Sequence, residues 1–292
     1  MKKTPTINRI LIVYKKSSYE EHVLDEKDAN YLRLLKEKSI VLQKSKNIHE
    51  IHIDTLETIQ GYLRQLKIPF DVRLRYELKP TSDYDLVITV GGDGTFLETS
   101  HYVTEGLLMG VNSVPKESVG YYCHATTDTF LEKIYLYLKG KAKIQELHRL
   151  QMTIDGLQKG PLALNDILYA NQNPAGTTRY LLKIGHQKEE QKSSGLWISP
   201  APGSTAATQS AGGKRLPLGS KNIQFVTREP YAPIGKQYKL LHGIFSPKQK
   251  VEITSLMDDA AVFIDGPHEI FPVKRGTKVV VQHTPHPIRA IW

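Results

Sequence analysis

The segment 85–95 constrains the fold more than any other part of the sequence. Residues 85–90 (DLVITV) are apolar and β-branched, a pattern typical of a buried strand. The glycine-rich segment Gly91–Thr95 (GGDGT) follows at once, and residues 96–103 then have a helix-like pattern. Because open α/β sheets bind ligands at the carboxyl ends of their strands, we expect a functional loop at this point.

Strand and helix signals alternate through the first third of the chain. This alternation predicts an α/β domain with a doubly wound, mainly parallel sheet. A helix is expected over 54–66, because Asp54 and Glu57 form a capping box and an apolar stripe follows. The other elements expected here are strands at 9–14, 71–76 and 107–111 and helices at 28–46 and 130–138.

Helical periodicity fades after residue 138, and short strand candidates separated by turn residues replace it. This pattern predicts a mainly β second domain, and we place the boundary near residue 146. The strand candidates are 151–154, 165–170, 179–184, 196–199, 222–227, 250–255 and 261–265.

Composition excludes several classes of protein. The chain has 292 residues, of which 40% are hydrophobic, unlike a disordered, collagen-like or coiled-coil chain. No apolar run approaches the roughly 18 residues that span a bilayer. The basic start, residues 1–4, precedes no apolar signal segment, so we expect a cytoplasmic protein without membrane contact.

The net charge of +9 is concentrated in residues 179–250, which hold twelve Lys or Arg and three Glu. Such a local excess favours an anionic ligand on this half of the chain, and a solvated basic surface is the alternative. No zinc-finger pattern or pattern of basic residues interleaved with aromatics is present, so we do not expect nucleic-acid binding.

Few residues suggest a protein-held metal or a reactive thiol. The single cysteine, Cys123, excludes a disulfide framework and a Cys-based zinc site, and we expect it in the core. The pairs His49/His52 and His283/His286 have H-x-x-H spacing without a surrounding metal motif. We therefore expect solvated histidines, and metal ligands stay unknown from sequence.

The segment Gly91–Thr95 has the features of a phosphate-binding loop. Glycines let the backbone approach a phosphate closely, and N–H groups at a helix N-terminus favour an anion. The carboxylate of Asp93 would repel a phosphate bound by these glycines. Its presence is explained if it accepts a hydroxyl proton or holds Mg²⁺. The alternative is a tight strand-to-helix turn that Asp93 only caps. Neither a Walker A loop nor a Rossmann fingerprint occurs in the chain.

Two further segments are candidates for ligand contact. The small and hydroxyl residues of Pro202–Gly213 can pack close to a flat ligand, although a flexible linker has the same composition. Asn165 and Asp166 are adjacent polar groups between apolar residues. They can hydrogen-bond the vicinal hydroxyls of a ribose, and a plain Asx turn is the alternative.

The order and spacing of these three segments resemble the NAD kinase family. Residues 110–121 (GVNSVPKESVGY) and 192–196 (KSSGL) resemble the branch of mitochondrial NAD kinases and plant NADH kinases. The resemblance covers about residues 11–276. The first motif alone is shared with diacylglycerol, sphingosine and phosphofructokinase-type kinases.

The resemblance implies phosphoryl transfer from ATP with Mg²⁺, or from polyphosphate, to the adenosine ribose 2′-hydroxyl of NAD or NADH. It implies a homodimer or higher homo-oligomer and an active site between an α/β domain (1–146) and a β-rich dinucleotide-binding domain (147–270). A C-terminal segment, 271–292, would return to the first domain.

The alternatives are a lipid or sugar kinase sharing the GGDGT loop and a non-catalytic dinucleotide-binding regulator. The resemblance assigns catalysis to Asp93, phosphate binding to Gly91, Gly92, Gly94 and Thr95, and NAD binding to Asn112, Tyr121, Asn165, Asp166, Thr205, Ala206 and Ser210.

Three positions depart from the family's usual pattern. Ser194 stands where an acidic residue is usual, and Ala207 stands where a Tyr is usual. The usual Asn-Glu pair is Asn165-Asp166 here. Loss of the ring at Ala207 leaves the preference between NAD and NADH open. The sequence does not select which cations of 179–250, among them Lys214, Arg215 and Arg228, contact phosphate.

Overall fold

The computed structural model describes residues 7–235 and 237–292, so the basic start of the chain, residues 1–4, lies outside the described part. The chain forms two compact units. The first runs to Gln145 and includes Arg289–Trp292, and the second is Glu146–Ile288. The segment that returns to the first unit thus begins at 289 and not at 271, because residues 271–288 belong mainly to strands of the second unit.

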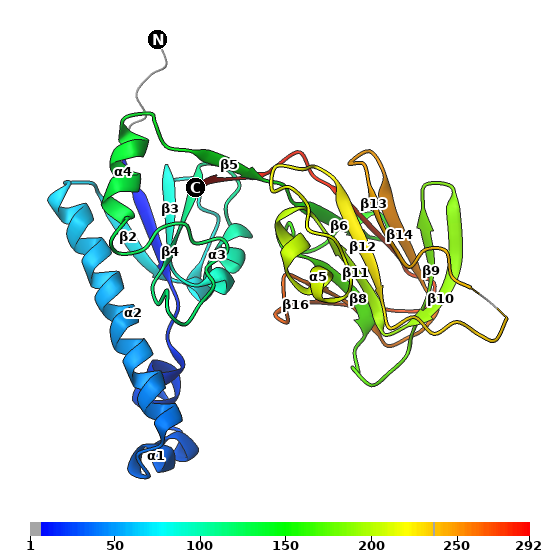
Figure 1. Ribbon diagram of the computed structural model, residues 1–292, viewed down its shortest axis with the longest axis horizontal. Helices are drawn as coiled ribbons and strands as arrows, with labels where there is room; N and C mark the ends of the chain where they lie inside the picture. The colour runs from blue at the N-terminus through cyan, green and yellow to red at the C-terminus, as the bar shows by residue number, and fades with distance from the viewer. Residues whose placement is uncertain (1–6, 236) are drawn as a thin grey trace. The chain divides into compact units, whose positions relative to one another are not determined.

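A six-stranded sheet forms the centre of the first unit (Figure 1). Its pairs β1–β2, β1–β3, β3–β4 and β4–β18 are all parallel, which confirms the predicted α/β fold with a mainly parallel sheet. The central strands β3 and β4 are buried along their whole length. In sheet order the strands are β2 (Phe70–Leu74), β1 (Ile10–Tyr14), β3 (Leu86–Gly91), β4 (Leu107–Asn112), β18 (Ile288–Ile291) and β5 (Ile144–Leu147).

Helices cover both faces of this sheet, α2 and α4 one face and α3 the other (Figure 1). The first half of α2 projects beyond the carboxyl end of β1, together with α1. Within the described residues, no helix has both the length and the apolar character needed to cross a membrane. The helical elements are η1 (Glu20–Asp25), α1 (Ala29–Lys36), α2 (Ile40–Gln65), η2 (Arg75–Glu77), α3 (Asp93–Ser100) and α4 (Phe130–Leu138).

Two helix predictions for this unit were wrong in their limits. The helix expected over 28–46 is divided, because Lys38 takes a left-handed φ of 52° between α1 and α2. The capping box at Asp54 begins no helix, since α2 already runs from Ile40 through this point. Part of the buried face of α2 before residue 56 is polar, with His52 and Thr55, so an apolar pattern does not show it.

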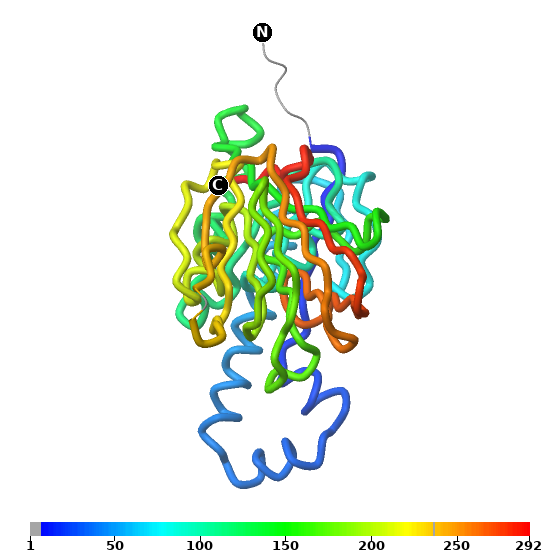
Figure 2. The backbone as a smooth tube through the Cα atoms, turned by 90° about the vertical axis from the view of Figure 1, so that its right-hand side faces the viewer, coloured from blue at the N-terminus to red at the C-terminus, as the bar shows by residue number. Residues whose placement is uncertain are grey.

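The second unit is a sandwich of two antiparallel sheets whose inner faces share one core, as the predicted β-rich second domain requires. Figure 2 shows segments distant in sequence side by side, such as the light green β9 beside the orange β14. One sheet contains β10 (Gln187–Ser193), β9 (Thr178–Ile184), β14 (Lys250–Ser255), β17 (Lys278–His283), β6 (Leu150–Ile154) and β7 (Leu157–Gln158). The other contains β13 (His242–Phe245), β12 (Ile223–Arg228), β11 (Gly195–Ser199), β8 (Ile167–Asn171), β15 (Ala260–Ile264) and β16 (Glu269–Val273).

Alternation of inward and outward side chains builds this sandwich. In β9, Tyr180, Leu182 and Ile184 point into the core while Arg179 is exposed. Each of the seven predicted strand segments overlaps an observed strand. The edge strand β10 was not predicted because its sequence, QKEEQKS, is polar.

The packing of α2 on the sheet gives a stability test with an internal control. Ile59 is fully buried against the sheet, whereas Ile51 on the same helix is 39% exposed. Ile59→Ala should destabilise the protein by about 2–5 kcal/mol, because it leaves a cavity in the core. Ile51→Ala should change stability by about 0.5 kcal/mol or less. Equal losses in chemical unfolding would show that α2 does not pack as described.

Candidate active site

The glycine-rich segment lies between a buried strand and a helix, as the residue pattern around it predicts. Strand β3 ends at Gly91 and α3 begins at Asp93. Gly91 is required by close approach, because a Cβ there would lie 2.5 Å from Oγ1 of Thr95. A Cβ on Gly94 would meet only open space. That Thr95 hydroxyl is buried and has no hydrogen-bond partner within the described part of the chain.

The Asp93 carboxylate is fixed by two backbone amides. Its Oδ2 accepts a hydrogen bond of 2.9 Å from the N–H of Tyr121, and its Oδ1 accepts one of 2.7 Å from Tyr122. Gly92 occupies the N-cap of α3, so the alternative in which Asp93 merely caps the helix is wrong. The carboxylate is therefore held in one orientation by residues that follow the next strand, β4.

Asn112 organises the segment that leads from β4 to these amides. Its buried side-chain amide donates to the carbonyl of Ser118 (3.1 Å), and its Oδ1 accepts from the N–H of Val114 (3.2 Å). Tyr121 is half-buried, with its ring edge-on to that of Tyr122 at 5.2 Å between centroids. The first unit therefore brings Asn112 and Tyr121 next to Asp93 and the glycine loop.

In the second unit, Asn165 and Asp166 form a turn held by a distant carboxylate. Asp265 accepts hydrogen bonds from the backbone N–H groups of Leu164, Asn165 and Asp166, at 2.7–3.0 Å. The side-chain amide of Asn165 donates to Oδ2 of Asp166 at 2.9 Å. Burial, and then the Asp265 carboxylate, raise the pKa of Asp166 to about 7. Sequence reasoning missed Asp265, which lies about one hundred residues away along the chain.

The segment predicted to line a dinucleotide pocket is folded and is not a linker. It contains the turn η3 (Pro202–Thr205) and the short helix α5 (Ala207–Ser210). Gly203 packs so closely on Asn165 that any Cβ would overlap the Asn165 carbonyl oxygen. The turn η3 therefore adjoins the Asn165 turn, with Thr205 and Ala206 half-buried and Ser210 exposed.

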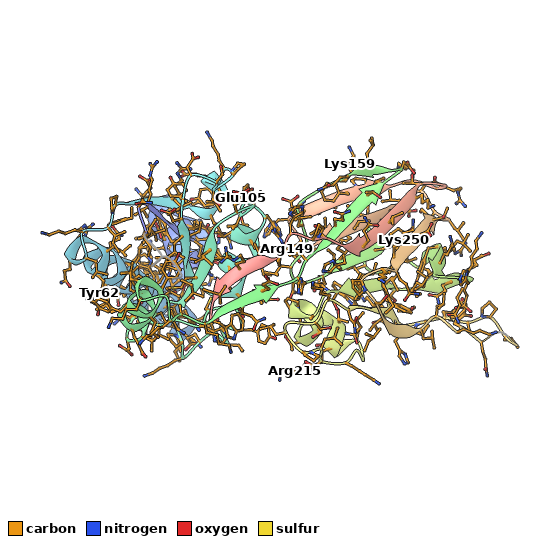
Figure 3. The ribbon with its side chains drawn as sticks, turned by 90° about the horizontal axis from the view of Figure 1, so that it is seen from above. Tyr62, Glu105, Arg149, Lys159, Arg215 and Lys250 are labelled. Carbon is orange, nitrogen blue, oxygen red and sulfur yellow. The ribbon has the colours of Figure 1, made fainter. Side chains whose placement is uncertain are left out.

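Cations in the second unit divide into engaged and exposed groups. Lys183 and Lys278 both pair with Glu252, and Arg228 lies over the ring of Trp197. Lys214 and Arg215, just after α5, are exposed and available to an anion. Arg149 and Arg215 are labelled in Figure 3. Arg149 is fully buried, and its Nε donates to the carbonyl of His286 (2.9 Å).

Within residues 7–235 and 237–292, no group of three or more His, Cys, Asp or Glu side chains lies close enough together to hold a metal ion. Cys123 is free and buried, as expected. The expectation of a solvated His52 was wrong. This imidazole is 2% exposed and bonds through both ring nitrogens, and a polar residue inside an otherwise ordinary helix gave no sequence signal.

Comparison with known proteins supplies independent information. No model of a known protein family matches the chain. A probable NADH kinase of Oryza sativa subsp. japonica is 32% identical over 249 residues, covering 77% of each chain. The NADH kinase of Arabidopsis thaliana is 32% identical over 253 residues, covering 77% of this chain and 78% of the relative. An NAD kinase of Clostridium tetani is 27% identical, covering 74% and 77%.

The fold is that of solved kinases of the same kind. An NAD kinase from Archaeoglobus fulgidus in complex with ATP superposes with a TM-score of 0.70 at 18% identity, covering 97% of this chain and 93% of that one. Yeast NADH kinase complexed with NADH gives 0.72 at 14% identity, covering 98% and 84%. With the identities above, the chain belongs to the family of NADH kinases and NAD kinases.

The raised pKa of Asp166 predicts a specific dependence of stability on pH. Between its ordinary pKa of 3.8 and about 7, the folded state binds more protons than the unfolded state. Stability therefore falls as pH rises through this window, by at most about 1.4 kcal/mol per pH unit from this group. Asp166→Asn should remove that contribution, so the variant should gain stability relative to the wild type as pH rises.

Chemical unfolding at several pH values between 4 and 8 measures this difference. Asp128→Asn, at an exposed position, is the matched control and should follow the wild type. An Asp166→Asn curve parallel to that of the wild type would show that Asp166 is ionised throughout the window.

Proposed function

We propose that this protein transfers the terminal phosphoryl group of ATP to the 2′-hydroxyl of the adenosine ribose in NAD or NADH. The 2′-oxygen forms the new bond to phosphorus, the bond between that phosphorus and ADP breaks, and the hydroxyl proton passes to Asp93. Family membership supports this assignment. The observation that carries it is the Asp93 carboxylate, fixed by two amides beside a glycine loop at the carboxyl end of β3.

The residues of the first unit suit this chemistry. Phosphoryl transfer depends mainly on positioning and on neutralising charge, and a preorganised acceptor needs no reorganisation during the reaction. The two amide bonds to Asp93 leave each carboxylate oxygen with remaining acceptor capacity. Gly91, Gly92, Gly94 and Thr95 are assigned to the phosphates, and the unpartnered Thr95 hydroxyl fits that role.

Magnesium fits this site as an ion that arrives with the nucleotide. Mg²⁺ is commonly held by one or two carboxylates together with substrate phosphates and water, and it needs no cage of protein ligands. Asp93 supplies the carboxylate of the loop. Bound Mg²⁺ would neutralise charge on the transferring phosphoryl group.

The second unit is assigned to the dinucleotide. Asn165 and Asp166 would bind the hydroxyls of a ribose, because their polar groups sit together on a turn fixed by Asp265. Thr205, Ala206 and Ser210, with Asn112 and Tyr121 of the first unit, are assigned to the rest of NAD(H). The Arabidopsis relative is named an NADH kinase, and the yeast structure contains NADH. Both support NADH as an acceptor to test beside NAD.

The proposal includes two expectations carried from the sequence, a cytoplasmic location and a homodimer or higher homo-oligomer. Light scattering of the purified protein should give a mass of at least twice 33.0 kDa. A monomer that turns over at full rate would remove the homo-oligomer from the proposal and leave the reaction intact.

Replacement of Asp93 tests the proposed reaction. Asp93→Asn keeps the size of the side chain but removes the proton acceptor and one of the two oxygens that accept from the Tyr121 and Tyr122 amides, so kcat should fall about 10²–10⁴-fold. The KM for NAD should change little, because binding does not depend on proton transfer. Steady-state formation of NADP(H) measures both constants.

Asp128→Asn makes the same chemical change at an exposed position and should keep full activity. Thermal unfolding of both variants confirms that each is folded. Near-normal turnover by a folded Asp93→Asn variant would refute the role of Asp93 as the proton acceptor.

A further inference from the structure

A cavity of about 450 Å³ opens within the first unit, at the carboxyl ends of β1, β3 and β4. Gly91 and Gly92 of the glycine loop line it on one side, with Asn112 and Ser113. Lys15, just after β1, and the first half of α2, including His52, line the other. Its volume is within the range of small-molecule pockets, and its place in the sheet is where α/β folds bind ligands.

The cations near this cavity differ in whether a carboxylate neutralises them. Lys16 pairs with Asp25, Lys44 pairs with Glu117 at 2.6 Å, and Arg75 pairs with Glu98 at 3.1 Å. Lys15, which lines the cavity, forms no ion pair with any described residue.

The charge on Lys15 is therefore not paired with a carboxylate in direct contact among the described residues, although Glu21 acts on it from farther away. Loss of hydration, and then the charge of Arg75, lower the pKa of the exposed Lys15 amine, while the Glu21 carboxylate raises it. An anion in the cavity would give this amine an ion-pair partner.

His52 fixes the backbone from which Lys15 projects. Its Nε2 donates to the Lys15 carbonyl at 2.9 Å, because a carbonyl can only accept. Burial lowers the pKa of His52, so the ring is neutral and its Nδ1 accepts from the Ser113 hydroxyl at 2.8 Å. The buried imidazole thus ties the residue after β1 to the residue after β4, on two sides of the cavity.

Other contacts also fix the residues that follow β1 and β4. The hydroxyl of Ser17 accepts from the N–H of Glu20 and bonds to the imidazole of His49. Thr55 donates to the carbonyl of Ser113 at 3.2 Å. The position of Lys15 relative to Gly91 and Gly92 is therefore set by a network and not by a free loop.

We propose that Lys15 binds the terminal phosphates of a nucleoside triphosphate in this cavity and that His52 is its positioning residue. The identity of that nucleotide as the phosphoryl donor rests on the proposed function. Gly91 and Gly92, which are assigned to the phosphates, line the cavity and favour the donor as its ligand, and Asn112, which is assigned to NAD(H), lies beside them. Val41 and Ile48 add apolar surface suited to a nucleoside, which a chain of inorganic phosphates does not have.

Binding of ATP without NAD tests the role of Lys15. In titration calorimetry, Lys15→Met should weaken ATP binding about tenfold to a hundredfold, as expected for loss of a charge-assisted bond. AMP, which lacks the terminal phosphates, and NAD should bind with unchanged affinity. Lys16→Met is the matched control, since Lys16 already pairs with Asp25 and does not line the cavity.

The outcomes separate this inference from the proposed function. Unchanged ATP affinity in Lys15→Met would overturn it, whether or not NAD is phosphorylated. Wild-type binding of inorganic tripolyphosphate but not of ATP would overturn the nucleoside assignment. ATP binding that depends on Lys15, in a protein that never phosphorylates NAD or NADH, would support this inference and refute the proposed function.

His52 needs a test that separates positioning from general stability. His52→Leu should weaken ATP binding and leave NAD binding unchanged, and His52→Gln, which keeps a donor for the Lys15 carbonyl, should restore most of the ATP affinity. In a Lys15→Met background the His52→Leu effect on ATP should largely disappear, because His52 acts through Lys15. Equal losses of ATP and NAD affinity, or additive effects in the double variant, would overturn the positioning role.

Discussion

The geometry of the candidate site in the first unit depends on the two hydrogen bonds that the amides of Tyr121 and Tyr122 donate to Asp93. Bonds from N–H groups to a carboxylate are stronger than bonds between neutral partners. These two join the loop after β3 to the segment after β4, so they fix both the glycine loop and the orientation of the carboxylate. A group that must meet a substrate hydroxyl in one geometry gains from such preorganisation.

The second unit uses the same device for a different purpose. Asp265 accepts from three consecutive backbone amides and so builds the turn that presents Asn165 and Asp166. Gly203 then allows η3 to pack directly on that turn. In both units a carboxylate organises backbone amides into a rigid loop, and loops fixed in this way present polar groups without losing entropy when a ligand binds.

Local patterns predicted what local physics determines. The buried strand before Gly91, seven strands of the sandwich and helix α4 have apolar patterns that predicted them, whereas the central strand β17 was not predicted although its Val279 and Val281 lie in the core. The continuity of α2 between residues 46 and 54 was missed because its buried face there relies on the polar side chain of His52, which bonds a loop carbonyl and a hydroxyl. Asp265 was missed because its partners lie far away in sequence. The candidate residues were selected by family resemblance, and the geometry supplies the reasons why several of them lie together.

The most direct measurement of the central claim is turnover by the purified wild-type protein. It would be incubated with Mg-ATP and either NAD or NADH, with 2′-phosphorylated dinucleotide and ADP quantified together. The account predicts NADP or NADPH from at least one acceptor, with one ADP formed for each product molecule. ATP hydrolysis without phosphorylated dinucleotide, or no product from either acceptor, would contradict it.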